Sequence, residues 1–333
     1  KIKQEFFENN DKLLKTQIEK GRIYCKQLRR KKCKACGKKI NGKKINIRNI
    51  TYLQCNYCTH LNGIYEDTFK FVNTIYSSKK INYSQKYAEK DRKNYISRVN
   101  NIYKPKVDFL KSNLKNFKSI KILDIGTGSG YFVSALKKEN IKNSFGIEVS
   151  KDQVLYGKKM LRAQKFDENS ILHVPFNKLE NFLKVYKNYN CASFIGVIEH
   201  LQEMEKIVSL VSKNKKCELI FISVPLYSFT SLIESNFPQV FNRHLGGSHT
   251  HLFTEKSVKH FFEKLNFIPH SEWWFGQDYN DLFRSMSVMS KKLNNTGTTI
   301  ILEQFRNLID DFQIVLDRKK MSSEVHILFK RKK

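Results

Sequence analysis

The chain has 333 residues, 40% of them hydrophobic, which is enough for one substantial core and a smaller module. The longest apolar run, LIFISVPL, is far shorter than the roughly 20 residues of a membrane-spanning helix. Four of the seven cysteines form two C-x-x-C pairs rather than a disulfide framework, so we expect a cytoplasmic protein. The formal charge of +30 indicates either a surface that binds nucleic acid or the lysine, asparagine and isoleucine bias of an AT-rich coding sequence.

Residues 1–30 are predicted to form a charged N-terminal helix, because apolar side chains recur at helical spacing in FFENNDKLLKTQIEKGRIYCKQL.

The next segment, residues 31–62, predicts a zinc ribbon. Its cysteines follow the spacing C-x2-C-x18-C-x2-C: Cys33, Cys36, Cys55 and Cys58. This spacing is typical of a tetrahedral site of four thiolates, which leaves no coordination position open for catalysis. We therefore expect a structural Zn²⁺ that stabilises a unit too small to have its own core. The remaining cysteines, Cys25, Cys191 and Cys217, are expected to be buried or free.

The ribbon also has a basic surface. Seven lysines lie along it: Lys31, Lys32, Lys34, Lys38, Lys39, Lys43 and Lys44. Such a surface favours contacts to phosphate groups, whether these belong to RNA or to a nucleotide diphosphate.

Residues 63–118 are predicted to form polar, tyrosine-rich helices that connect the ribbon to the rest of the chain. Residues 119–333 then alternate short apolar strands with amphipathic helices, which is the pattern of an α/β sheet with helices on both faces. The predicted strands are KILDIG, NSFGIEV, ILHVPF, CASFIGVI, CELIFISVP, FIPHSEWWF and EVHILFKR. The stretch KLNNTGTT, residues 292–299, is predicted to be a polar loop.

A glycine turn, G-x-G-x-G, follows the first of these strands at Gly126, Gly128 and Gly130. The dinucleotide fingerprint requires a glycine where this chain has Tyr131, so the turn is less suited to a pyrophosphate. Asp124 adds a carboxylate at the strand end, which suits a cationic ligand. Glu148, at the end of the next strand, can accept both hydroxyls of a ribose in charge-assisted hydrogen bonds.

Four motifs taken in order, LDIGTGSGYF, GIEVS, GVIEHL and ISVP, resemble those of the class I S-adenosylmethionine-dependent methyltransferases. The resemblance is strongest to the branch of ubiquinone-type O-methyltransferases and bacterial sugar methyltransferases, and it covers Lys121 to Phe275. One departure is Cys191, where relatives usually have an aspartate with a structural role. The resemblance implies a Rossmann-like fold with a mostly parallel sheet and an antiparallel last strand.

The same resemblance implies where S-adenosylmethionine binds. The expected cofactor residues are Asp124, Gly126, Thr127, Gly128, Gly130, Glu148 and Glu199. Adenine is expected near SILHVPF, residues 170–176. In this family the segment before the sheet folds over the cofactor as a lid, so Tyr83 or Tyr87 belongs either to such a lid or to an ordinary amphipathic helix.

Three histidines are candidates for the catalytic base: His200, His249 and His251. His200 follows the fourth strand in GVIEHL, near the expected reacting centre, and an imidazole with an ordinary pKa of about 6.5 suits removal of a hydroxyl proton. The alternative is that His200 caps a helix or packs beneath the cofactor. His249 and His251 lie in a glycine-containing loop where relatives bind substrate, or they are bonded to the backbone.

These patterns predict a methyltransferase acting on a hydroxyl, with a carbon as second choice, of a sugar or nucleotide-linked small molecule for surface polysaccharide. Sugar-modifying relatives often carry a zinc-binding segment before the catalytic domain. The first alternative is an RNA methyltransferase, since some enzymes that methylate ribosomal RNA grip it with an N-terminal zinc finger. The second alternative is a non-catalytic binding module.

Overall fold

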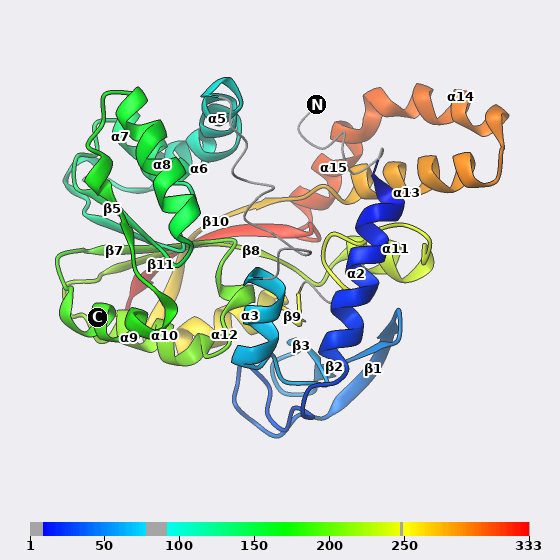
Figure 1. Ribbon diagram of the computed structural model, residues 1–333, viewed down its shortest axis with the longest axis horizontal. Coiled ribbons are helices and arrows are strands. Elements are labelled where there is room, and N and C mark those ends of the chain that lie inside the picture. Colours follow the sequence, from blue (N-terminus) through cyan, green and yellow to red (C-terminus); the bar gives the residue numbers. More distant parts are fainter. Residues whose placement is uncertain (1–8, 78–91, 247–248, 333) are drawn as a thin grey trace. The chain divides into compact units, whose positions relative to one another are not determined.

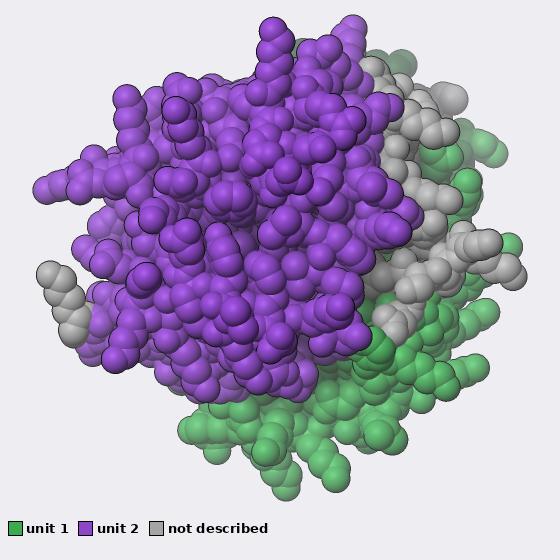
Figure 2. Space-filling view, turned by 60° about the vertical axis from the view of Figure 1, so that its left-hand side comes forward, with its two compact units in different colours: residues 1–74, 224–261, 274–325 green, residues 75–223, 262–273, 326–333 purple. Residues whose placement is uncertain are grey.

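The computed structural model describes residues 9–77, 92–246 and 249–332 (Figure 1). The chain divides into two compact units that are each assembled from separate stretches of sequence (Figure 2). Unit 1 contains residues 1–74, 224–261 and 274–325, and unit 2 contains residues 75–223, 262–273 and 326–333. Among the described residues, no helix is both long enough and apolar enough to cross a membrane. The possible lid residues Tyr83 and Tyr87 lie outside the described residues.

Unit 2 is built on a seven-stranded sheet, as far as the described residues show, with the order β10-β11-β8-β7-β4-β5-β6. Strands β4, β5, β6, β7 and β8 pair in parallel, and the last strand runs antiparallel. The strands are β4 (Ile122–Ile125), β5 (Ser144–Glu148), β6 (Ile171–His173), β7 (Cys191–Ile195), β8 (Leu219–Pro225), β10 (Phe267–Phe275) and β11 (Glu324–Arg331). Each lies within a predicted strand, so the Rossmann-like α/β fold is confirmed.

Helices cover both faces of this sheet, which explains why its central strands are uninterrupted apolar runs. Helices α7 (Tyr131–Lys138) and α8 (Lys151–Ala163) lie on one face, and α9 (Phe176–Val185) and α10 (Met204–Ser212) lie on the other (Figure 1). Phe132 and Leu136 of α7 are buried in a core that also includes Ile122 and Phe221 of the sheet. Short helical turns precede or follow several strands: η2 (Phe117–Ser119), η3 (Glu168–Ser170) and η4 (Ile198–His200).

A helical segment before the sheet also packs on α7. It consists of α5 (Arg92–Arg98), the π-helical turn η1 (Val99–Tyr103) and α6 (Lys104–Asn113). The ring of Tyr95 stacks on that of Tyr131 with centroids 4.6 Å apart. Within residues 63–118 the described chain is helical in α3 (Phe69–Ser77), α5, η1, α6 and η2 and non-helical at residues 64–68.

Unit 1 contains the cysteine segment and most of the remaining helices. Its four-stranded sheet, within the described residues, has the order β1-β2-β3-β9, with strands at Gly42–Ile47, Ile50–Cys55, Leu61–Gly63 and His251–Leu252. Its helices are α2 (Asn10–Tyr24), most of α3 (Phe69–Ser77), α11 (Phe229–Asn236), most of α12 (Glu255–Glu263), α13 (Asp278–Lys292), α14 (Thr296–Phe305), the turn η5 (Arg306–Leu308) and α15 (Ile309–Arg318).

Two expectations about these elements need comment. The predicted N-terminal helix is present as α2. The predicted loop at residues 292–299 is wrong over its second half, because α14 begins at Thr296. The first residues of α14, TGTT, are polar and contain a glycine, so they show no apolar side chains at helical spacing. The apolar residues of this helix come only after them, in IILEQF.

Candidate cofactor site and cysteine cluster

The glycine turn of unit 2 lies between β4 and α7, and its backbone needs glycine at three points. Gly126, Gly128 and Gly130 have φ angles of 74°, 57° and 71°, in the left-handed region that side chains disfavour. A Cβ atom at Gly126 would meet Val197 Cγ2 at 2.6 Å, and one at Gly130 would meet Ile171 Cδ1 at 2.0 Å. The turn is thus packed too closely for any larger residue.

Glu148, at the end of β5, holds this turn in place. Its carboxylate accepts the backbone N–H of Gly128 at 2.9 Å through Oε2 and that of Ser150 at 2.9 Å through Oε1. Burial raises the pKa of the Glu148 carboxyl, and these backbone donors oppose that rise. A carboxylate has about four lone-pair sites, so two more hydroxyl donors fit on the same group.

Asp124, at the end of β4, is a second buried carboxylate. It is 2% exposed and accepts a hydrogen bond from the Ser193 hydroxyl at 2.7 Å. Burial raises its pKa to about 7, although the Ser193 bond acts in the opposite direction. A cation placed beside Asp124 would favour the ionised form, which is the electrostatic property that a sulfonium or ammonium ligand needs.

The cofactor residues expected from the sequence therefore meet at one edge of the unit 2 sheet. Asp124, the glycine turn and Glu148 follow adjacent parallel strands, and ligands of open α/β sheets bind outside the carboxyl ends of such strands. Thr127 is buried, and its N–H donates to the carbonyl of Ile147 at 3.0 Å, which ties the turn to β5.

The segment predicted to lie near adenine, residues 170–176, contains β6, the strand at the edge of the same sheet. A cavity of about 370 Å³ lies beside it, lined by Leu172, His173 and Val174 together with side chains of α8 and α9. The side chain of Val149, next to Glu148, is exposed.

The turn after β7 carries Glu199 and His200 in η4. Glu199 is 4% exposed and His200 is partly exposed. The His200 N–H donates to the Val197 carbonyl, and Gly196 has a φ of 65°, so a sharp turn directs this segment out of the sheet. Both residues thus belong to the same strand-end region of unit 2 as the cofactor candidates.

His249 and His251 belong to unit 1, in the chain that leads into β9. Nδ1 of His249 lies 2.8 Å from the carbonyl oxygen of His244, so Nδ1 carries the proton and Nε2 is the basic nitrogen. Burial lowers the pKa of His249 to about 4, which keeps the ring neutral. His251 is completely buried, and its Nδ1 lies 3.0 Å from Nε2 of His60. This packing favours a structural role for His251.

The histidine loop is fixed by a residue that the sequence analysis did not select. Glu234 of α11 is 4% exposed and accepts the backbone N–H groups of His244 and Leu245, each at 2.8 Å. Burial raises the pKa of Glu234 to about 7. In the sequence, a glutamate on an amphipathic helix does not indicate that its carboxylate accepts backbone N–H groups from a loop ten residues further along.

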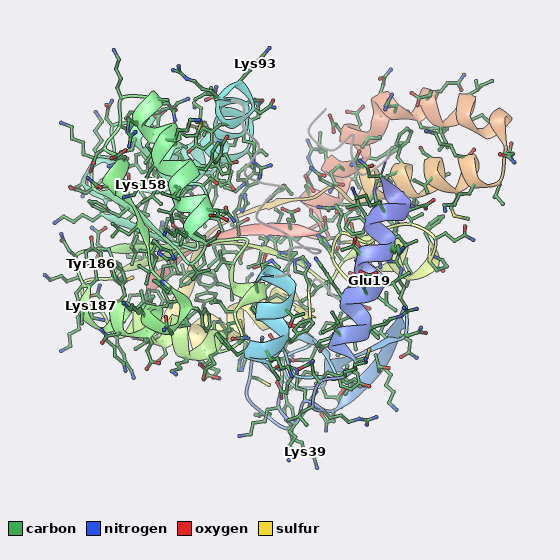
Figure 3. The ribbon with its side chains drawn as sticks, in the orientation of Figure 1. Glu19, Lys39, Lys93, Lys158, Tyr186 and Lys187 are labelled. Atoms are coloured by element: carbon green, nitrogen blue, oxygen red, sulfur yellow. The ribbon has the colours of Figure 1, made fainter. Side chains whose placement is uncertain are left out.

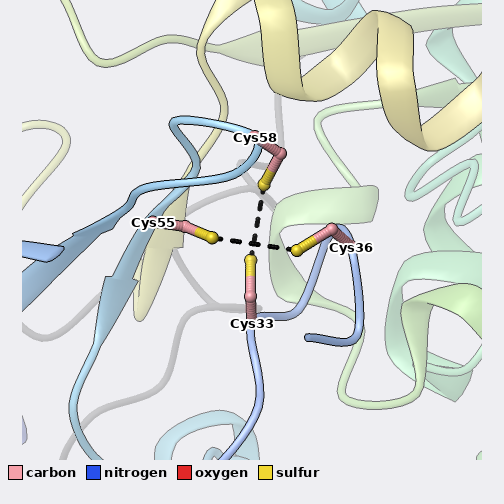
Figure 4. A group of neighbouring side chains, drawn as sticks. All are labelled: Cys33, Cys36, Cys55 and Cys58. Atoms are coloured by element: carbon pink, nitrogen blue, oxygen red, sulfur yellow. Dashed lines mark hydrogen bonds between the residues drawn. The ribbon is translucent and has the colours of Figure 1, made fainter. Parts of the chain in front are cut away.

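The four predicted metal ligands converge in unit 1 (Figure 4). The sulfur atoms of Cys33, Cys36, Cys55 and Cys58 all lie within 4.8 Å of one another, and all four residues are buried. The Cys33–Cys58 and Cys36–Cys55 sulfur pairs are 3.6 and 3.7 Å apart, too far for disulfides. Four thiolates about 2.3 Å from zinc form a tetrahedron with edges of about 3.8 Å, so the cluster fits that metal.

Two knuckles of the same form present these sulfurs. In the first, the N–H of Cys33 donates to the Lys38 carbonyl and that of Gly37 to the Cys33 carbonyl; in the second, the N–H of Cys55 donates to His60 and that of Thr59 to Cys55. Gly37 and Thr59 have φ angles of 72° and 64°.

Asn62 supports this cluster and is another residue that the sequence did not indicate. Its amide donates to Cys33 Sγ at 3.4 Å, and its oxygen accepts the Lys34 N–H at 2.9 Å. Hydrogen bonds from Cys58 and Asn62 lower the pKa of the Cys33 thiol to about 5. Metal-ligating groups are commonly held by such outer hydrogen bonds.

The basic surface of the ribbon needs one correction. Lys34 does not contribute to it, because its side chain is 4% exposed and forms a buried ion pair with Asp67. Six lysines remain exposed: Lys31, Lys32, Lys38, Lys39, Lys43 and Lys44. Lys39 extends away from the ribbon (Figure 3), and Nζ of Lys38 lies 4.1 Å from the ring centre of the exposed Tyr57.

A contact to the glycine turn also came from outside the motifs. The hydroxyl of Tyr95 in α5 donates to the Ser129 carbonyl at 3.0 Å. Tyr95 lies in the segment predicted to be a helical linker or lid, and through this hydrogen bond it contacts the glycine turn.

Comparison with known proteins gives a family match. The family model described as "Methyltransferase domain" matches residues 95–272, which is 178 of the 333 residues. Comparison with curated proteins gives no significant match.

Solved structures of low identity also resemble the chain. A SAM-dependent methyltransferase from Archaeoglobus fulgidus is 18% identical over 75% of this chain and 100% of its own, with a TM-score of 0.44. Geranyl diphosphate C-methyltransferase from Streptomyces coelicolor A3(2) is 14% identical over 72% and 83%, with a TM-score of 0.43. Magnesium protoporphyrin IX methyltransferase from Synechocystis PCC 6803 is 12% identical over 78% and 92%, with a TM-score of 0.43.

Proposed function

The chain belongs to the methyltransferase-domain family, and from this premise we propose that it transfers the methyl group of S-adenosylmethionine to a hydroxyl of a sugar or nucleotide-linked small molecule. A carbon acceptor is the second choice. The observation that carries the cofactor assignment is the pairing of a glycine turn with two buried carboxylates, Asp124 and Glu148, at the ends of adjacent strands.

Each part of this site has a role toward the cofactor. When bound, S-adenosylmethionine supplies a methyl group on a positively charged sulfur. Asp124 favours the cationic end of the cofactor, and the glycine turn lets the backbone approach it closely. Glu148 accepts the ribose hydroxyls while it keeps its bonds to Gly128 and Ser150. Glu199 is assigned to the same site, at the end of β7.

We propose His200 as the base that removes the acceptor proton, because it follows β7 in the unit that holds the cofactor residues. His249 is the alternative, since its neutral ring has Nδ1 bonded to a carbonyl and Nε2 as the basic nitrogen. His251, our third candidate in the sequence, is the weakest of the three, because its buried ring is bonded to His60.

Single alanine variants distinguish these histidines. H200A should lower turnover by about 100- to 10,000-fold if His200 is the base, while the affinity for the cofactor stays unchanged. H270A is the matched control, because His270 is an exposed histidine of the same unit. Full turnover in H200A together with loss of turnover in H249A would transfer the role to His249.

We also propose that the four-cysteine cluster holds a structural Zn²⁺. The supporting observations are the sulfur spacing, the burial of all four cysteines and the hydrogen bond from Asn62 to Cys33. Four thiolates fill the tetrahedral shell, so zinc contributes to folding and not to methyl transfer.

The acceptor class rests on the sequence resemblance and on the ribbon surface. Exposed lysines near an exposed tyrosine suit a nucleotide diphosphate, because the cations bind phosphate and the ring packs against a base. The same surface favours RNA as the alternative acceptor, since aromatic and cationic side chains also bind single strands. The motif GVIEHL after β7, which has no proline or aromatic residue, favours the small molecule over a base nitrogen.

Labelling tests the two acceptors directly. The purified protein is mixed with methyl-labelled S-adenosylmethionine and a cell extract, and small molecules are separated from RNA with and without ribonuclease. We expect label in low-mass anionic species that ribonuclease does not affect. Label in a polymer that ribonuclease destroys would refute the small-molecule proposal, and absence of label together with absence of cofactor binding would support a non-catalytic module.

A further inference from the structure

The C-terminal part of unit 1 forms a helical hairpin. Helix α13 runs outward, and α14, η5 and α15 return along it (Figure 1). On the inner side of the returning segment, Leu302 is 7% exposed and Gln313 is 8% exposed. The Gln313 amide donates to the buried carboxylate of Asp278 at 3.2 Å, and the Arg306 guanidinium lies over the ring of Phe283. The returning segment is therefore anchored to α13 on one side.

The same segment also exposes five apolar side chains, carried by α14, the turn η5 and α15, which we call the 301–315 stripe. Its five residues are 39–56% exposed: Ile301, Phe305, Leu308, Phe312 and Val315. Their spacings are four, three, four and three, which is the repeat of the apolar seam between two packed helices. A seam of this kind normally faces a partner helix.

The stripe is large enough to form the centre of a stable interface. A side chain of this size that is about half exposed offers about 100 Å² of apolar surface, so the five together offer about 500 Å². A standard interface covers about 800 Å² on each partner, with somewhat more than half of it apolar. Ile300 and Ile314 of the same segment are also exposed.

We propose that the 301–315 stripe binds the same stripe of a second copy of this chain, in an antiparallel two-fold arrangement centred on Leu308. The order of residues is nearly palindromic about this centre. Phe305 and Phe312 lie three and four residues on either side of Leu308, and the β-branched Ile301 and Val315 lie seven residues on either side. A two-fold axis therefore brings phenylalanine against phenylalanine and β-branched side chain against β-branched side chain.

The charges beside the stripe agree with this arrangement. Arg306 takes no part in it, because its guanidinium lies over the Phe283 ring and pairs with Glu303 at 3.0 Å. Gln304 and Asp311 border the seam on one side, and an antiparallel copy brings the amide of one close to the carboxylate of the other. No pair of like charges is placed across the centre.

The same charges disfavour a lipid surface. Over α14, η5 and α15, residues 296–318, the sequence has four acidic residues and two arginines, a net charge of 2 − 4 = −2: Glu303, Arg306, Asp310, Asp311, Asp317 and Arg318. Helices that lie on membranes usually carry a basic polar face, which anionic lipids attract. A net negative border instead suits a protein seam.

Substitutions at the axis test the proposal with the full-length chain. Analytical ultracentrifugation of the unmodified protein should give twice the chain mass of 39.3 kDa. L308D alone and L308K alone should each weaken association on the order of 100-fold, because two like charges meet at the centre of the interface. An equimolar mixture of the two should restore the doubled mass. L293D is the control, since Leu293 is exposed on the same hairpin but off the stripe.

Circular dichroism should be unchanged in L308D, because Leu308 is 42% exposed, whereas the unfolding midpoint should fall only as far as loss of the dimer lowers it. A monomeric unmodified protein, or dimers that persist in L308D, would overturn the proposal. Flotation of the unmodified protein with phosphatidylcholine vesicles, lost in L308D, would overturn it in favour of a lipid. A mixture of L308D and L308K that stays monomeric would reject the antiparallel axis.

Discussion

Glu148 offers the sharpest test of the cofactor site, because one carboxylate holds the glycine turn and is proposed to hold the ribose. The variant E148Q keeps the size of the side chain and removes its charge. Hydrogen bonds to a charged group contribute about 1.5–3 kcal/mol and neutral ones about 0.5–1.5 kcal/mol. For two ribose hydroxyls the loss is about 2–3 kcal/mol, so S-adenosylmethionine should bind roughly 30- to 160-fold more weakly.

The same substitution should also lower stability, for a reason that the hydrogen bonds show. Both oxygens of Glu148 accept a backbone N–H, one from Gly128 and one from Ser150. Glutamine has only one oxygen, so its NH₂ group must face one of those donors. Leaving one buried N–H without its acceptor costs about 1–3 kcal/mol.

Calorimetric titration with S-adenosylmethionine and urea unfolding measure the two effects separately. E263Q is the matched control, because Glu263 is an exposed carboxylate of the same unit. If E148Q bound the cofactor within twofold of the unmodified protein, the assignment of the ribose to Glu148 would be refuted. If its stability were also unchanged, the described hydrogen bonds would be incorrect as well.

Three further predictions concern other parts of the two units. Burial raises the pKa of Asp124 to about 7, so the neutral carboxyl stabilises the fold below about pH 4, and this contribution is lost as the pH rises to about 7. In urea unfolding, D124N should therefore be as stable as the unmodified protein at about pH 4 and more stable at about pH 8. An equal difference in stability at both pH values would contradict this. Elemental analysis should find zinc in the purified protein and in C25S but not in C58S, and C58S should unfold at lower urea; zinc-free, fully stable protein would exclude the metal. G130A should destabilise by several kcal/mol, because its φ is positive and its Cβ would overlap Ile171. G297A is the control, because its Cβ would meet only Asn295 Oδ1 at an ordinary contact distance of 3.8 Å. Equal unfolding midpoints for the two variants would show that the turn adapts.

The strands of unit 2 could be predicted because each is a short apolar run bounded by polar residues. Buried parallel strands need such runs, and the sequence from Ile122 to Pro225 repeats them at regular intervals. The start of α14 could not be predicted, because Asn, Thr and Gly favour loops and the helix depends on apolar residues further along. The unit boundaries were equally inaccessible, since unit 1 collects three stretches of sequence that lie far apart.

For the candidate site, the sequence indicated the motif residues that the structure brings together, and it did not indicate the residues that support them. Asp124, Glu148 and the four cysteines carry fixed spacings that reflect a turn or a metal, so the sequence reveals them. Asn62 and Glu234 act through contacts to distant backbone or sulfur atoms. Such contacts depend on the fold, and an isolated amide or carboxylate in the sequence does not indicate them.

The distribution of charge resolves part of the question that the composition raised. With 61 basic residues in 333, a stretch of 25 residues would carry about five by chance, yet residues 293–317 contain one, Arg306. A coding bias toward lysine would act on every exposed helix, including this one. Lysine is missing between residues 293 and 317, although Lys291, Lys292, Lys319 and Lys320 flank this segment. We infer that the two surfaces have different partners: anions at the ribbon, and an apolar seam at the hairpin.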